Sequence, residues 1–552
     1  MAGQPRMPDV PHRSGPGDAR RRHPGAWVRA PLVATVLLAL VACSGAPIAS
    51  GPSPTAASPR ASPGPAVPLA DALATLSPRA VWAHFSDLER IPRASHQEAR
   101  ATAFVAAFGR SLGFQTIVDR VGNVMVRAPA TAGMEGRPGV VLQAHLDMVT
   151  VKTAASTIDF VSDPIQAVVQ DGWVHALGTT LGADDGIGVA IIMALLEARD
   201  VAHGPLEALF TVDEEDLFTG VSNLAPDLLQ GSRSINVDNE DDGQLLISSA
   251  GGAYVEASRP YAQVSTPGGM TGVRITVDGL LGGHSGADID KGRGSAHQIM
   301  ARLLLGAPAA LGVRVASLAG GDIQNAIPSM ASALVALPPG QAGALEAYVR
   351  EFGAKIAGEL AASDPKVALT AAPATLPARV MDATDQATLI GVVAAAPQGV
   401  VRMSADVPGL VETSSNLGVL TIADGMFTAS DFVRSALDAE RDSLAQRCSR
   451  LFADAGAAVT VDGAYLAWPP NLASPLLAVM KGAYATLFGT APAVAAMHIG
   501  LETSVVRATY PAMDMVSVGP TLRDVHSPDE RLEVASVAKV YSLLVATLAQ
   551  AR

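Results

Sequence analysis

The stretch GVVLQAHLDM, residues 139–148, is an apolar run that ends in polar side chains. The run predicts a core strand over Gly139–Gln143, and because side chains alternate along a strand, His145 and Asp147 should lie on one side of its end. Asp147 could then orient the imidazole of His145, as carboxylates do for metal-binding histidines. A histidine near a strand end is more often simply a hydrogen-bonded polar residue, so this stretch alone does not define a site.

Helical and strand-like patterns alternate on both sides of this stretch. Helices are predicted from Ser77, over Glu98–Leu112 and over Val189–Glu197, with strands over Val121–Val126 and Leu206–Val212. This alternation predicts an α/β sheet. A second, α+β domain is predicted after Gly252 from a strand at Val273–Val277, a glycine-rich turn at Leu281–Gly286 and helices over His297–Leu305 and Ala344–Leu360.

The composition excludes some kinds of partner and some kinds of metal site. Lys and Arg number 39 against 52 Asp and Glu among 552 residues, and this net charge of −13 argues against nucleic acid as a partner. The two cysteines, Cys43 and Cys448, cannot build a disulfide framework or a cysteine metal site. Any metal must therefore be held by histidine and carboxylate.

The N-terminus has the composition of an export signal. Residues 1–42 combine six arginines with the apolar segment Ala30–Ala42, which is too short to span a bilayer. The segment ends in LVAC, residues 40–43, and this resembles the lipobox of bacterial lipoproteins, whose cysteine is lipidated. We therefore expect a lipoprotein signal peptide over 1–42, and a lipidated Cys43 with a Pro-, Ser- and Ala-rich linker over 43–68. The protein would be exported and lipid-anchored to a bacterial membrane on its extracytoplasmic side.

Four further stretches supply acids or histidine at a helix start or after an apolar segment. They are GADDGIG (182–188), VDEED (212–216), INVDNED (235–241) and GPTLRDVHSPDE (519–530). Singly, each has an ordinary explanation, such as an acid that caps a helix or a solvated acidic turn. Together they offer the donors that divalent cations bind, and a bridging carboxylate allows two ions to lie about 3.5 to 4 Å apart in hydrolytic sites.

The order of these stretches and their residues resemble those of the dinuclear zinc aminopeptidase and carboxypeptidase family that includes carboxypeptidase G and aminoacylase. They are especially similar to its aminoacyl-histidine dipeptidase branch, and GGHSG (282–286), NAIP (325–328), VETS (411–414) and VRSALD (433–438) extend the match. The resemblance runs from about Leu69 to the C-terminus. It implies an α/β zinc-peptidase catalytic domain with a mixed central sheet flanked by helices, in two parts over 69–251 and 466–552. An inserted α+β lid and dimerisation domain would span 252–465.

The resemblance also implies two divalent metal ions per subunit, with zinc as the first expectation and cobalt or manganese as alternatives. From the matching motifs, His145, Asp184 and Asp238 would bind one ion. Asp184, Glu215 and His526 would bind the other, so that Asp184 bridges the two. Asp147 would orient His145, and Glu214 would be the general base toward a metal-activated water. In the lid, His284 would stabilise the oxyanion, and Asn325 and Arg434 would bind the substrate.

The implied activity is hydrolysis of Xaa-His dipeptides, carnosine-like ones included. A tripeptidase, an N-acyl amino acid deacylase or a carboxypeptidase of the same family would use the same ligands. A non-catalytic peptide-binding lipoprotein would be expected to lack Glu214 or a ligand, and none is missing. The expected partners are a dipeptide substrate, a membrane through the lipid anchor alone, and a second subunit through the lid. Gln324 replaces an arginine of the branch, which leaves the substrate preference open.

Overall fold

In the computed structural model of the protein, which describes residues 64–551, an eight-stranded mixed sheet forms the centre of one core. The strand order is β2 (Gln115–Val118), β3 (Val124–Ala128), β7 (Leu206–Thr211), β4 (Val140–His145), β8 (Arg233–Asn236), β22 (Asp514–Ser517), β9 (Gln244–Ser249) and β21 (Ala493–Met497). The neighbours β7, β4, β8 and β22 run parallel. Their carboxyl ends therefore meet at one edge of the sheet.

Helices pack with this sheet in the same core. They are α2 (Arg79–Leu88), α3 (Ala99–Ser111), α4 (Ala183–Glu197), α10 (Pro475–Phe488) and α12 (Val534–Gln550), with the short α1 (Leu69–Ala72). The short helices α5 (Thr219–Ser222) and α11 (Glu502–Thr509) belong to a separate, smaller apolar cluster that includes Val141 and Leu209. The residues of α4 from Gly186 to Leu196 are all buried. A helix that is apolar all round is typical of a position inside a core.

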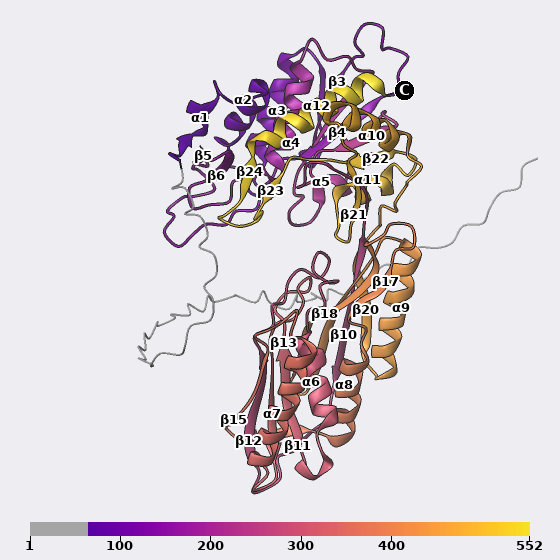
Figure 1. The fold of residues 1–552 in the computed structure, drawn as a ribbon. Coiled ribbons are helices and arrows are strands. Elements are labelled where there is room, and N and C mark those ends of the chain that lie inside the picture. The colour runs from indigo at the N-terminus through magenta and orange to yellow at the C-terminus, as the bar shows by residue number, and fades with distance from the viewer. Residues whose placement is uncertain (1–63, 552) are drawn as a thin grey trace, which may run out of the picture. The chain divides into compact units, whose positions relative to one another are not determined.

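The C-terminal segment returns to the elements of the N-terminal half (Figure 1). Strand β24 (Arg531–Glu533) pairs with β6 (Trp173–Ala176) in a five-stranded sheet, which also contains β1 (Val67–Pro68), β5 (Ala167–Gln170) and β23 (Leu522–Arg523). Figure 1 shows this yellow segment among the indigo and magenta elements. His526, which follows β23, therefore lies beside a residue that precedes it by more than 300 positions.

A nine-stranded antiparallel sheet has a core of its own. Its order is β15 (Ala368–Ala374), β12 (Thr271–Asp278), β14 (Ala331–Leu337), β13 (Arg314–Gly320), β18 (Val411–Ala423), β19 (Met426–Ser435), β10 (Gly251–Pro260) and β20 (Ala458–Tyr465), with β17 (Gly399–Met403) beside β18. Helices α6 (Ala296–Gly306), α7 (Ala342–Glu359), α8 (Ala383–Ala395) and α9 (Asp438–Asp454) contribute to this core. A separate two-stranded sheet joins β11 (Gln263–Ser265) to β16 (Arg379–Met381). The boundaries expected at 252 and 465 stay predictions.

The predicted α/β class, with a mixed sheet and a second α+β part, is confirmed. The strand predicted over Val121–Val126 is wrong at its start, because β3 begins only at Val124. Asp119 Oδ1 accepts hydrogen bonds from the backbone N–H groups of Val121, Gly122 and Asn123, each at 3.0 Å. These bonds hold the preceding residues in a turn.

Candidate metal centre

Asp184 directs one carboxylate oxygen toward each of two histidines. Its Oδ1 lies 3.1 Å from His145 Nε2, and its Oδ2 lies 3.1 Å from His526 Nε2. His145 is the last residue of β4, whereas Asp184 lies at the start of α4, where the Asp184–Asp185 peptide is cis. A carboxylate that faces two imidazoles in this way has the arrangement of a ligand that bridges two cations.

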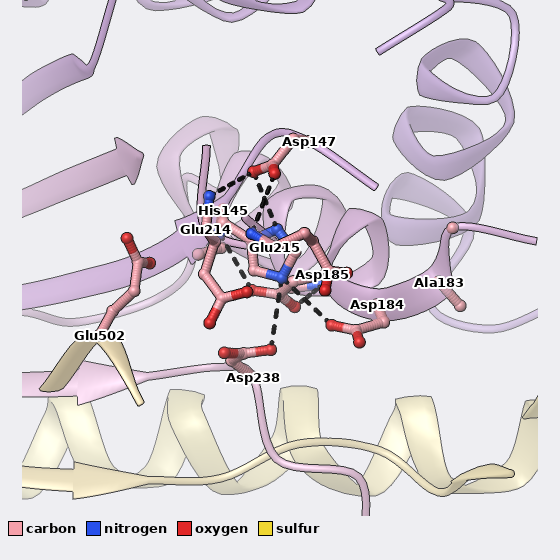
Figure 2. A network of polar contacts seen from close by, with 12 residues as sticks. His145, Asp147, Ala183, Asp184, Asp185, Glu214, Glu215, Asp238 and Glu502 are labelled. Atoms are coloured by element: carbon pink, nitrogen blue, oxygen red, sulfur yellow. Dashed lines mark hydrogen bonds and ion pairs between the residues drawn. The ribbon is translucent and has the colours of Figure 1, made fainter. Parts of the chain in front are cut away.

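Two more acids complete the surroundings of the histidines, and Figure 2 shows the acids gathered around His145. Asp238 Oδ1 lies 3.7 Å from His145 Nε2, and Glu215 Oε2 lies 3.0 Å from His526 Nε2. The ligand atoms within each of two triplets lie no more than 4.8 Å apart: His145, Asp184 and Asp238, and Asp184, Glu215 and His526. The structure thus brings together both sets that the sequence motifs predict.

The parallel strands explain how these residues meet. Strand β4 ends at His145, β8 ends two residues before Asp238, and β7 ends three residues before Glu214. These three strands are neighbours in the sheet, so the chain that leaves each of them starts from the same edge. Sites in open α/β sheets lie outside the carboxyl ends of the strands for this reason.

Asp147 has more partners than the predicted contact with His145. Its Oδ1 lies 3.4 Å from His145 Nδ1 and accepts the backbone N–H of Glu214 at 3.0 Å. Its Oδ2 accepts the backbone N–H of Glu215 at 3.1 Å and the hydroxyl of Ser95 at 2.8 Å. Burial would raise the pKa of Asp147, but the hydrogen bonds, that with His145 first, lower it to about 2. Asp147 is therefore ionised and ties the end of β4 to the turn that carries both glutamates.

The site concentrates buried negative charge. Burial raises the pKa of Glu214 well above its ordinary value and that of Asp238 to about 6. Burial would lower the pKa of His526, but Asp184 and Glu215 raise it to about 11. Among residues 64–551, the carboxylates of Asp184, Glu215 and Asp238 form ion pairs only with His145 and His526. Oε1 of Glu215 is buried without a hydrogen-bond partner.

Buried carboxylates in excess of their cations are costly unless further positive charge is supplied. Divalent ions would supply it, and imidazole nitrogens with carboxylate oxygens are a donor set that suits zinc, cobalt and manganese. The residues present therefore fit two divalent ions, although they do not identify the metal.

The predicted lid residues lie together at the end of the antiparallel sheet. Nδ1 of His284 accepts the backbone N–H groups of Gly286 at 3.1 Å and Ala287 at 3.0 Å. His284 Nε2 lies 3.5 Å from Arg434 Nη2, and the backbone carbonyl of Asn325 accepts the N–H of Ser285 at 2.8 Å. Burial, followed by the charge of Arg434, lowers the pKa of His284 to about 4, so its imidazole is neutral near pH 7.

Arg434 is a buried cation. It is 3% exposed, and within the described part of the chain it forms no ion pair with an acid. Its guanidinium stacks 4.1 Å from the ring of Phe432 and donates to the hydroxyl of Tyr465 at 3.2 Å. A buried guanidinium held by aromatic residues and left without an acid is suited to bind an anion from outside the chain.

Two further polar residues, His498 and Glu502, are also buried near the residues described above. His498 Nε2 lies 2.7 Å from Ser414 Oγ, and burial, with the charge of Arg434, lowers its pKa to about 3. Glu502 accepts a hydrogen bond from Thr211 Oγ1 at 2.6 Å and another from Gln143 Nε2, and burial raises its pKa to about 8. Sequence reasoning missed Glu530 and Arg93, which hold the loop before Asp184. The only signal was the place of Glu530 four residues after His526.

Comparison with known proteins agrees with this geometry. The profile of the peptidase family M20/M25/M40 matches residues 141–550. The cytosol non-specific dipeptidase of Escherichia coli strain K12 is 37% identical over 476 residues, which cover 86% of this chain and 98% of that protein. The structure of the aminoacylhistidine dipeptidase from Vibrio alginolyticus matches with 36% identity and a TM-score of 0.80, over 87% of this chain and 98% of that chain. A tripeptidase from Staphylococcus aureus shares the fold at 15% identity, with a TM-score of 0.53 over 86% of this chain and 98% of its own.

The comparison corrects the predicted localisation. The Escherichia coli relative is named a cytosol dipeptidase, which contradicts an exported, extracytoplasmic protein on a lipid anchor. That prediction depended on the composition of residues 1–42 and on the lipobox-like stretch LVAC at residues 40–43, and all of these residues lie outside the described ones. Over residues 64–551, none of the helices is both long and apolar enough to cross a membrane. Neither the anchor nor the predicted dimer through the lid is supported by the relatives, and the dimer stays a prediction.

Proposed function

Because the chain belongs to the peptidase family M20/M25/M40 and is a metal-dependent dipeptidase, we propose that it hydrolyses Xaa-His dipeptides with two divalent ions and Glu214 as the general base. The observation that carries this proposal is the position of Asp184 between His145 and His526, with one oxygen toward each. One ion would be held by His145, Asp184 and Asp238, and the other by Asp184, Glu215 and His526. Bound divalent ions polarise a carbonyl oxygen and increase the acidity of water.

Glu214 is the proposed proton carrier. It lies beside the proposed ligand Glu215, it is half-buried, and its raised pKa favours acceptance of a proton near neutral pH. Its backbone N–H donates a hydrogen bond to Asp147, which fixes the turn that carries the Glu214 side chain. Glu214 would take a proton from the water that attacks the peptide carbonyl and deliver it to the nitrogen of the leaving amine.

His284 is the proposed donor to the carbonyl oxygen. Since its Nδ1 accepts two backbone N–H groups, the proton of the neutral ring must be on Nε2. The Nε2–H group can then donate a hydrogen bond to the oxygen as negative charge develops on it. The tautomer is set by the Gly286 and Ala287 backbone and does not depend on an acidic partner.

Arg434 and Asn325 are the proposed substrate anchors. The guanidinium of Arg434 can bind the C-terminal carboxylate of a dipeptide through two parallel hydrogen bonds, which would supply the anion that its burial requires. Asn325 lies on the loop whose backbone bonds to Ser285, next to His284. An anchor for a carboxylate favours substrates with a free C-terminus.

The specificity for a C-terminal histidine is supported by the similarity to the Vibrio enzyme, which is named for that activity. The Escherichia coli relative is named a non-specific dipeptidase, which favours a broader preference as the second candidate. The test is a panel of β-alanyl-histidine, alanyl-histidine, alanyl-alanine, a tripeptide and an N-acetyl amino acid, given to the metal-reconstituted protein. We expect the highest kcat/KM for the two histidine dipeptides. Equal values for alanyl-alanine would favour the broad dipeptidase, and a preference for the tripeptide or the acetylated substrate would overturn the proposal.

A further inference from the structure

Glu530 accepts hydrogen bonds from four successive backbone N–H groups. Its Oε2 lies 2.7 Å from the nitrogen of Leu181 and 3.0 Å from that of Gly182, and its Oε1 lies 2.8 Å from Ala183 N and 3.4 Å from Asp184 N. The side chain is buried, with the residue 2% exposed. One carboxylate thus satisfies the whole loop that ends in Asp184, the residue that both ligand triplets share.

Arg93 holds the same loop from its carbonyl side. Its guanidinium donates to the carbonyl of Gly182 at 2.5 Å and to that of Asp147 at 3.1 Å, and its Nη2 lies 3.1 Å from Oε1 of Glu89. Gly182 has a φ of +73°, and a Cβ there would lie 2.6 Å from Arg93 Nη2. The loop is therefore fixed on both sides and has no space for a side chain at this glycine.

The segment that carries Glu530 also carries His526. The hydroxyl of Ser527 donates to the carbonyl of Asp524 at 2.6 Å. The N–H of Glu530 donates to the carbonyl of Ser527 at 3.1 Å, so the four residues from Ser527 to Glu530 form a tight turn directly after His526. His526, at the start of this segment, has its Nε2 3.1 Å from Asp184 Oδ2. Glu530, at the end of the segment, accepts a hydrogen bond from the backbone N–H of Asp184. Both contacts join the same two segments.

We propose that Glu530 is a positioning residue of the metal centre: by binding the N–H groups of Leu181–Asp184, it sets the separation between the carboxylate of Asp184 and the imidazole of His526. This inference rests on the proposed metal-dependent function. The alternative is that Glu530 only caps the N-terminus of α4, where negative charge is favourable in any helix. A cap would contribute to stability and would leave the affinity of the folded protein for metal unchanged.

The variant Glu530→Gln separates these roles. Four N–H donors require acceptors, and a glutamine has a single acceptor oxygen, so its NH₂ group would face two of the donors. The control is Asp529→Asn, which removes the same charge from the adjacent, exposed position. Purified full-length proteins are stripped of metal, checked for folding by circular dichroism, and titrated with cobalt(II), whose absorption spectrum reports the ligand geometry.

We expect folded Glu530→Gln to bind cobalt about 10- to 100-fold more weakly than the wild type, the range seen when groups that orient metal ligands are removed, with an altered cobalt spectrum. Asp529→Asn should match the wild type, and Glu530→Asp, which keeps the carboxylate, should lie between the wild type and Glu530→Gln. Wild-type affinity and spectrum in folded Glu530→Gln would overturn the inference, as would an equal loss in Asp529→Asn.

Should Glu530→Gln not fold, Glu530→Asp becomes the test, and wild-type cobalt affinity and spectrum in that variant would overturn the inference. Failure of the wild type itself to bind cobalt would instead refute the proposed metal-dependent function. The two failures are therefore distinguishable.

Discussion

The carboxylate of Asp147 binds both the imidazole of His145 and the backbone N–H of Glu214, at 3.4 and 3.0 Å. A proposed metal ligand and the proposed general base are thus positioned by one side chain. Asp147→Asn should lower kcat about 10- to 100-fold while the protein stays folded, because an amide cannot accept all the hydrogen bonds that the carboxylate accepts. Steady-state kinetics with metal in excess provide the measurement, and unchanged kcat would contradict the positioning role.

Glu214→Gln should keep both metal ions and lose hydrolysis. The amide cannot take the proton of the attacking water, and loss of general base catalysis costs about 100- to 10,000-fold. Asp216→Asn is the matched control, since it removes a charge from the exposed end of the same turn and should retain activity within a few fold. A folded, metal-loaded Glu214→Gln protein with more than a tenth of wild-type kcat would refute the assigned role.

Arg434→Lys should raise KM about 10- to 100-fold and change kcat less. Lysine keeps the charge but lacks the planar pair of donors that matches a carboxylate. A dipeptide whose C-terminus is amidated gives the specific readout. The wild type should lose affinity for the amidated substrate, whereas the variant should hardly discriminate between the two, and equal discrimination by both proteins would argue that Arg434 does not bind the carboxylate.

The metal-free protein should become less stable as the pH rises from about 6.5 to 8, where His284 and His498 have lost their protons in both states and no longer oppose the trend. Burial raises the pKa of Glu502 from 4.5 to about 8, so the folded state holds a proton that the unfolded state has lost, and stability falls with pH across this interval. The pKa of His526, raised to about 11, acts in the same direction above pH 6.5 because its protonated form is the stabilised one. Denaturant unfolding of chelator-treated protein at pH 6.5, 7 and 8 measures this effect, and a stability that increases with pH over this interval would contradict it.

Metal binding should weaken that dependence. The histidines must lose their protons to act as ligands, so metal affinity increases with pH and offsets the loss of stability. The metal-loaded protein therefore serves as the control in the same unfolding series.

The residues that the structure brings together as candidate ligands could be selected from the sequence because their signal is local. His145 ends an apolar strand, Asp184 begins an apolar helix, and Asp238 follows another apolar strand, and the order of these stretches indicated the family. Parallel pairing of β4, β7 and β8 then accounts for their meeting.

What the sequence did not predict depends on the path of the backbone. Glu530 acts on N–H groups almost 350 positions earlier, and Asp147 acts on those of Glu214 and Glu215 across two strand ends. Backbone donors are present at nearly every residue, so no residue type marks them as partners in advance. The export prediction, which depended on the composition of residues 1–42 and on the lipobox-like stretch LVAC (40–43), is contradicted by the relative that is named a cytosol dipeptidase.

The metal content of the purified protein, measured together with dipeptide hydrolysis before and after chelation, tests the central claim most directly. Two clusters that share Asp184 predict two divalent ions per chain and hydrolysis that is lost on chelation and restored by added metal. Fewer than one ion per chain, with hydrolysis indifferent to the chelator, would contradict the account.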